Sequence, residues 1–114
     1  LSRLEEGGFR LEPRALAPAA LLEDVAERIS PLYEAKGVTL RVDVPADLPT
    51  MRGDALRLAQ VLLNLLRNAL QHTPPGRTVT LGARREGDHV RVTVRDEGEG
   101  ILFIALLELK QARS

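Results

Sequence analysis

The chain is short of several features that mark particular classes of protein. It has no cysteine among its 114 residues, which excludes a disulfide framework and thiolate metal sites. Its only aromatic residues are Phe9, Tyr33 and Phe103, too few to stack the bases of a single-stranded nucleic acid. Its 16 basic and 16 acidic side chains cancel, so no overall field favours nucleic acid or an anionic membrane. A phosphate-binding site would therefore depend on a few neighbouring residues rather than on the overall charge.

Long apolar runs are also missing. No run approaches the ~20 residues that span a bilayer, and no signal peptide precedes the first charged residues. We therefore expect a soluble, cytoplasmic chain that contacts neither membrane nor nucleic acid. A chain of 114 residues is long enough for one domain with a modest core.

Two segments carry apolar residues at helical spacing. The first helix is expected at 18–36, between Pro18 and the Gly37 stop, with Pro31 interrupting and kinking it. The second is expected at 54–71, where Asp54 is a good N-cap and the Thr-Pro-Pro-Gly sequence beyond it ends the helix.

Three other segments alternate apolar and polar residues, which predicts strands at 38–44, 78–84 and 89–95. A Gly-Asp turn joins the last two as a hairpin. A loop follows the first at 45–49, and a short edge strand is expected at 9–12. Helices on one face of a mixed, mostly antiparallel sheet make an α+β fold, a two-layer sandwich.

The helix at 54–71 carries a polar stripe roughly 100° wide on an otherwise apolar surface. Two of its members are asparagines one turn apart, although asparagine is a poor helix former. An amide oxygen is a suitable Mg²⁺ ligand, and an amide NH₂ can reach phosphate. A solvated stripe without function is the alternative. The stripe consists of Arg57, Gln60, Asn64, Arg67, Asn68 and Gln71.

A second motif, Asp96-x-Gly98-x-Gly100, follows the hairpin. A carboxylate there can accept a hydrogen bond from an exocyclic amine such as the 6-amino group of adenine. The two glycines permit close approach of the backbone to a planar base. Ordinary turns and cation-binding loops share the pattern, so by itself it is not specific.

In this order and at this separation the two motifs resemble the ATP-binding catalytic domain (HATPase_c) of bacterial sensor histidine kinases, in the superfamily of gyrase, Hsp90 and MutL. The resemblance implies a Bergerat-type fold that is incomplete. It also implies that ATP or ADP binds with Mg²⁺, that Asn68 coordinates the metal and that Asp96 accepts from the adenine amine. The implied nucleotide-binding residues are Asn64, Asn68, Gln71, His72, Asp96, Gly98 and Gly100.

Two of those positions depart from the family, which often has a basic residue and a tyrosine where Gln71 and His72 stand. From its place at the helix end, His72 is expected to interact with the helix dipole rather than with a metal. Related ATPases resemble one another in having a glutamate base at the place of Asn64. An amide cannot take the proton, so the pattern favours phosphoryl transfer to a protein histidine over hydrolysis.

The resemblance divides the chain into three parts. Residues 1–8 resemble the end of a dimerisation helix, 9–101 a partial catalytic domain, and 102–114 form an apolar tail outside the family. We expect the tail to fold as a short helix that covers the core or pairs with a second copy. The family's phenylalanine box, lid and second glycine motif do not follow Ile101, so we expect a truncated domain without kinase activity, catalytic residues or strong nucleotide binding.

The parent protein implied by the resemblance can be membrane-anchored. It autophosphorylates a histidine of its dimerisation domain and passes the phosphoryl group to a response regulator. One alternative is a nucleotide-free protein-interaction module that uses the same scaffold and the apolar tail. A gyrase-type ATPase is disfavoured by Asn64.

Overall fold

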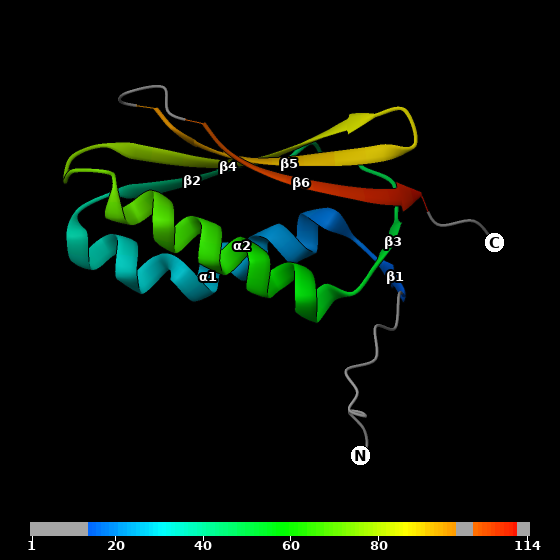
Figure 1. Ribbon diagram of the computed structural model, residues 1–114, viewed down its shortest axis with the longest axis horizontal. Helices are drawn as coiled ribbons and strands as arrows, with labels where there is room; N and C mark the ends of the chain where they lie inside the picture. Colours follow the sequence, from blue (N-terminus) through cyan, green and yellow to red (C-terminus); the bar gives the residue numbers. More distant parts are fainter. Residues whose placement is uncertain (1–13, 98–101, 112–114) are drawn as a thin grey trace, which may run out of the picture.

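The computed structural model describes residues 14–97 and 102–111, the latter as a backbone strand. Figure 1 shows two layers, with two helices side by side on one face of a sheet. The sheet has six strands in the order β1-β3-β6-β5-β4-β2. The predicted two-layer α+β sandwich is confirmed. The elements are β1 (Arg14–Leu16), α1 (Pro18–Lys36), β2 (Thr39–Asp43), β3 (Met51–Gly53), α2 (Ala55–Gln71), β4 (Thr78–Glu86), β5 (His89–Asp96) and β6 (Leu102–Gln111).

Helix α1 begins with proline in its first turn and ends at Gly37, whose φ of 78° is the left-handed conformation that glycine adopts most readily. The helix continues through Pro31, so our expectation of an interruption there was wrong. Proline removes a single backbone donor, and the buried side chains of Ile29 and Tyr33 on either side hold the helix to the core.

Helix α2 begins and ends where the sequence predicts. The Asp54 side chain accepts a hydrogen bond from the Arg57 backbone N–H at 3.2 Å, which confirms the N-cap. His72 follows the last helical residue, Gln71. The helix buries one side against the sheet and α1 while its polar stripe stays exposed.

The strands expected from alternation are present, each within two residues of its predicted bounds. Strands β4 and β5 form the predicted antiparallel hairpin, which turns at Gly87 with a φ of 62°. Strand β2 pairs with β4 in parallel, while the remaining pairs are antiparallel. The sheet is therefore mixed and mostly antiparallel, as predicted.

The tail is where the expectation fails. Residues 102–111 form strand β6, which lies between β5 and β3 in the sheet, rather than a helix. Leucine, alanine, glutamate and lysine are good helix formers, which favoured the helical interpretation. The free edge of β5 requires hydrogen-bond partners, and this tertiary demand outweighs local propensity. The backbone of β6 pairs Phe103 with Val94 and Ala105 with Val92.

The short strands β1 and β3 were not predicted from the sequence. Strand β3 lies just before Asp54, and β1 begins immediately after Pro13; they pair with each other at one edge of the sheet. Three residues are too few to show alternation. The segment at 9–12, predicted as an edge strand, lies outside the described residues, as do residues 1–8.

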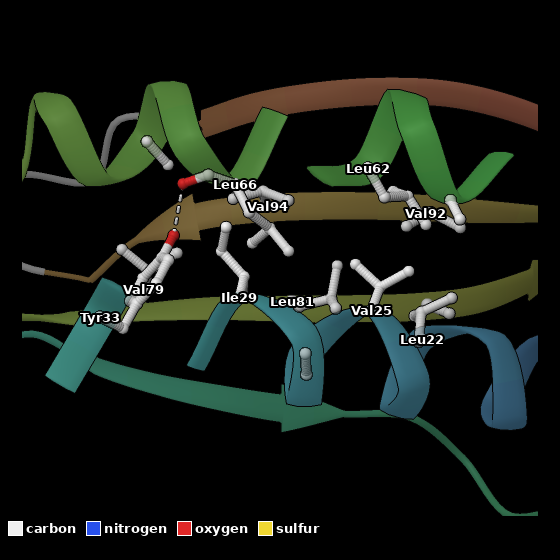
Figure 2. Packing of buried hydrophobic residues seen from close by; sticks show 14 of the residues in the cluster. Leu22, Val25, Ile29, Tyr33, Leu62, Leu66, Val79, Leu81, Val92 and Val94 are labelled. Carbon is white, nitrogen blue, oxygen red and sulfur yellow. Dashed lines mark hydrogen bonds between the residues drawn. The ribbon is translucent and has the colours of Figure 1, made fainter. Parts of the chain in front are cut away.

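The core lies between the helices and the sheet (Figure 2). Helix α1 and helix α2 both point apolar side chains at the covered face of β4 and β5. None of the helices in the described part of the chain is long and apolar enough to cross a membrane. The central core residues are Leu22, Val25, Ile29, Leu62, Leu66, Val79, Leu81, Val92 and Val94.

Candidate functional site

Asp96 lies at the end of β5 on the face that the helices cover. The alternation of β5 puts Val90, Val92 and Val94 on this face, and the same period places Asp96 there too. Its exposed fraction is 0%. Burying a carboxylate is costly unless hydrogen bonds compensate, so a buried aspartate at the end of an apolar row indicates a specific use.

Thr73 connects Asp96 to the end of α2. The Thr73 hydroxyl lies 2.7 Å from the carbonyl oxygen of Ala69 and 3.4 Å from Oδ2 of Asp96. A hydroxyl has one hydrogen, so the shorter contact to Ala69 is the stronger hydrogen bond and the contact to Asp96 is weak. A carboxylate has about four lone-pair directions, so a carboxylate at this place can accept hydrogen bonds from more than one donor.

Thr73 is the site residue that the sequence interpretation missed. It was treated as part of a helix-ending sequence, yet it is fully buried. Among the described residues, Thr73 and Asp96 are the buried polar or charged ones apart from Tyr33, whose hydroxyl is also buried. Its position could have identified it, because Thr73 carries a hydroxyl and directly follows the last turn of α2, near the strand that ends at Asp96.

The four candidate residues on α2 and just beyond it are exposed at its C-terminal half. They are Asn64, Asn68, Gln71 and His72. The residue after Asn68 is Ala69, whose carbonyl binds Thr73, so the turn that carries Asn68 is linked to Asp96 through Ala69 and Thr73. That Asn68 and Asp96 border one cavity stays a prediction. The other two candidates, Gly98 and Gly100, lie outside the described residues.

Helix α1 supports the same end of α2 from the other side. The buried Tyr33 hydroxyl donates to the carbonyl of Leu66 at 2.7 Å, drawn as the dashed line in Figure 2. Burial raises the pKa of Tyr33 well above its usual value, so the phenol remains a donor in alkaline solution as well as at neutral pH. Lys36 Nζ donates to the carbonyl of Leu70 at 2.6 Å. Neither contact was predicted from the sequence.

A hollow of about 340 Å³ lies on the opposite, open face of the sheet. Its lining includes Thr80, Gly82, Arg84 and Thr93, and none of the candidate residues contributes to it. The sheet separates this hollow from α2, so we place the site on the covered side, where the buried carboxylate is. The described residues include no group of three or more histidine, cysteine or acidic side chains that could hold a metal ion.

Two helices packed on one face of a mixed, mostly antiparallel sheet are the fold of the GHKL superfamily of ATPase domains. Residues 53–102 match the family described as histidine kinase-, DNA gyrase B-, and HSP90-like ATPase. This match includes the asparagines, Thr73 and the aspartate-glycine motif. The chain belongs to this family, as the ATP-binding domain of a sensor histidine kinase.

Individual relatives agree. The chain is 43% identical over 94 residues to the adaptive-response sensory kinase SasA of Synechococcus elongatus, covering 82% of this chain and 24% of SasA. It is 35% identical to full-length ShkA, solved in complex with AMPPNP, with a TM-score of 0.73, covering 82% of this chain and 20% of ShkA. ThkA, solved with the response regulator protein TrrA, shares the fold at 23% identity and a TM-score of 0.71, covering 86% of this chain and 30% of ThkA. The chain spans a quarter or less of the curated relatives' length.

Proposed function

We propose that this chain binds MgATP and MgADP as the nucleotide-binding part of a sensor histidine kinase. The observation that carries the proposal is the buried Asp96, linked by Thr73 to the turn of α2 that bears Asn68. The complex of the relative ShkA with AMPPNP, an ATP analogue, supports it, because that protein is 35% identical to this chain.

The roles follow from the chemistry of each group. The Asp96 carboxylate accepts a hydrogen bond from the adenine amine, because an anionic acceptor binds an N–H donor strongly. Asn68 supplies an amide oxygen to Mg²⁺, and Asn64, Gln71 and His72 line the phosphate side. Mg²⁺ retains several waters and takes one or two protein ligands plus phosphate oxygens, so an acidic cluster is not required. Gly98 and Gly100 let the backbone approach the base.

The reaction of the whole protein is proposed to be phosphoryl transfer to a histidine, followed by transfer to a response regulator. Asn64 stands where a general base would act on water, and a neutral amide cannot take that proton. Catalysis then depends on positioning and on neutralising phosphate charge. The acceptor histidine belongs to a dimerisation domain, and the cytoplasm supplies the ATP.

The interaction-module alternative is less favoured than the nucleotide-binding proposal. It relied on an apolar tail that docks onto a partner or a second copy. The backbone of β6 pairs with β5 along most of its length and with β3 at Lys110 and Gln111, so the strand is part of this sheet. The named relatives are sensor kinases, which also favours nucleotide binding.

Titration with ADP in the presence and absence of Mg²⁺, followed by amide chemical shifts, tests the proposal. We expect saturable shifts at Asn64, Asn68 and Thr73 and at Asp96. Asn68→Ala should abolish the part of the affinity that depends on Mg²⁺. Gln60→Ala, at the far end of the same exposed stripe, is the matched control and should leave the affinity unchanged. Absence of saturable binding would refute the proposal.

A further inference from the structure

Two side chains of α1 donate hydrogen bonds to backbone carbonyls of α2. Tyr33 binds the carbonyl of Leu66 at 2.7 Å and Lys36 binds that of Leu70 at 2.6 Å. The two acceptors lie two residues before and two residues after Asn68. Helix α2 has no basic residue in its own last turn, so the cation at its C-terminus comes from α1.

The two contacts differ in their physical basis. The carbonyl of Leu70 is one of the last four in the helix and also accepts from the Thr73 backbone N–H at 3.2 Å, while the ammonium group of Lys36 offsets the negative end of the helix dipole. The carbonyl of Leu66 lies within the helix and uses its second lone pair. Tyr33 is 1% exposed, so its hydroxyl would be unsatisfied if α2 shifted.

The contacts hold the side of α2 that faces away from Asn68. At ~100° per residue, Asn68 lies about 160° around the helix from both Leu66 and Leu70. On the sheet side, the same turn is linked through Ala69 to Thr73 and Asp96. The last turn of α2 is thus fixed from two directions, by α1 and by the end of β5.

We propose that Tyr33 and Lys36 are positioning residues of the nucleotide site, which set the place of Asn68 relative to Asp96 by holding the carbonyls of Leu66 and Leu70. The inference rests on the proposed function. It predicts that removing either donor loosens the turn first and weakens nucleotide binding as a result, since a site works only when its groups are held in place.

Tyr33→Phe removes one hydroxyl and keeps the ring in the core. We expect the MgADP dissociation constant to rise about 3- to 10-fold, the range that one hydrogen bond supports. Backbone amide exchange at residues 69–73 should accelerate by a similar factor, without nucleotide present, while exchange at 58–63 stays unchanged. The control is Ile29→Val, a buried change on the same helix that costs stability without removing a polar contact.

Lys36→Met provides an independent test because Lys36 is only partly buried and its stem is retained. It should weaken MgADP binding to a comparable extent, and Lys36→Arg, which keeps a cationic donor, should restore most of the affinity. Arg28→Met, which removes a cation paired with Asp24 within α1, should leave binding unchanged.

The outcomes separate the two proposals. Wild-type chain that fails to bind MgADP refutes the proposed function and the positioning role together. Wild-type chain that binds, with Tyr33→Phe binding equally well, overturns the positioning role alone. The role is also overturned if Ile29→Val at equal loss of stability weakens binding as much, because Tyr33 would then act only through stability.

Discussion

The two faces of the sheet tolerate charge very differently. On the face covered by the helices, β4 presents Val79, Leu81 and Ala83, and β5 presents three valines followed by Asp96 at its last position. On the open face the same strands present arginine, glutamate, threonine and glycine around a shallow hollow. A charge on the open face stays in water, whereas a charge on the covered face must be compensated by specific contacts.

This difference explains why Asp96 points to a functional site, whereas the more numerous charged residues on the open face do not. Open-face ion pairs such as that between Arg91 and Glu86, at 3.2 Å and half exposed, contribute little to stability. The buried carboxylate of Asp96 lies at the end of α2, in weak contact with the Thr73 hydroxyl at 3.4 Å. The burial of this acidic side chain makes Asp96 the candidate for ligand binding, and predictions that contrast the two faces test this interpretation.

The largest contrast concerns adjacent residues of β4 that point to opposite faces. Leu81→Ala on the covered face should lower the free energy of unfolding by about 2–5 kcal/mol, through lost burial and the cavity left behind. Thr80→Ser on the open face keeps the hydroxyl that donates to Glu97 and should change it by about 0.5 kcal/mol or less. Urea denaturation of both variants measures the difference. Equal losses would show that the open face is also covered in the folded protein.

The next contrast is one chemical change made on both faces. Asp96→Asn keeps the shape but removes the charge and can direct a donor at the adenine amine. Since hydrogen bonds to charged groups are worth ~1.5–3 kcal/mol, we expect MgADP affinity to fall roughly ten- to a hundredfold. Asp43→Asn, which lies beside the open-face hollow, should leave affinity unchanged. Calorimetry gives both constants, and an unaltered constant for Asp96→Asn would show that the base is held elsewhere.

Much of this arrangement was predictable from local patterns. The alternation in 78–84 and 89–95 predicted the hairpin, and Asp54 predicted the start of α2. Both predictions were confirmed because they depend on interactions between residues close in sequence. The motif order gave the family and therefore Asn68 and Asp96 as candidates. The period of β5 also implies that Asp96 is buried, since it continues the row of buried valines.

The predictions that were wrong or missing concern contacts between residues that are distant in the sequence. Residues 102–111 have the composition of a helix and become a strand because β5 needs a partner. The hydroxyl of Thr73 contacts Asp96, which lies 23 positions away, and the hydroxyl of Tyr33 contacts the carbonyl of Leu66, which lies 33 positions away. No local spacing predicts such pairs, because loops of any length can bring them together at modest entropic cost.

A third prediction uses the single tyrosine, which lies on the covered side. Burial raises the pKa of Tyr33, so the folded protein retains the phenolic proton after the unfolded chain has lost it. Stability should therefore be intact below about pH 10 and fall by ~1.4 kcal/mol per pH unit above it. Denaturation from pH 8 to 11 measures the slope. Tyr33→Phe should lack this component, and equal slopes in both proteins would contradict the assignment.

The smallest expected effect lies on the open face, at a pair of like charges. Arg84 is directly opposite Arg91 in the β4–β5 register, and like charges facing each other across a strand pair are destabilising. Arg84→Thr should therefore stabilise the protein by roughly 0.2–1 kcal/mol, an improvement limited by the Glu86 partner of Arg91. Arg95→Thr is the control because its cross-strand neighbour is Thr80, which carries no charge.

The stabilisation by Arg84→Thr should shrink in about 1 M salt, where the screening length falls to about 3 Å. A gain that persists unchanged in salt would assign the effect to strand propensity, and a loss of stability would show that Arg84 is paired with another group on this face.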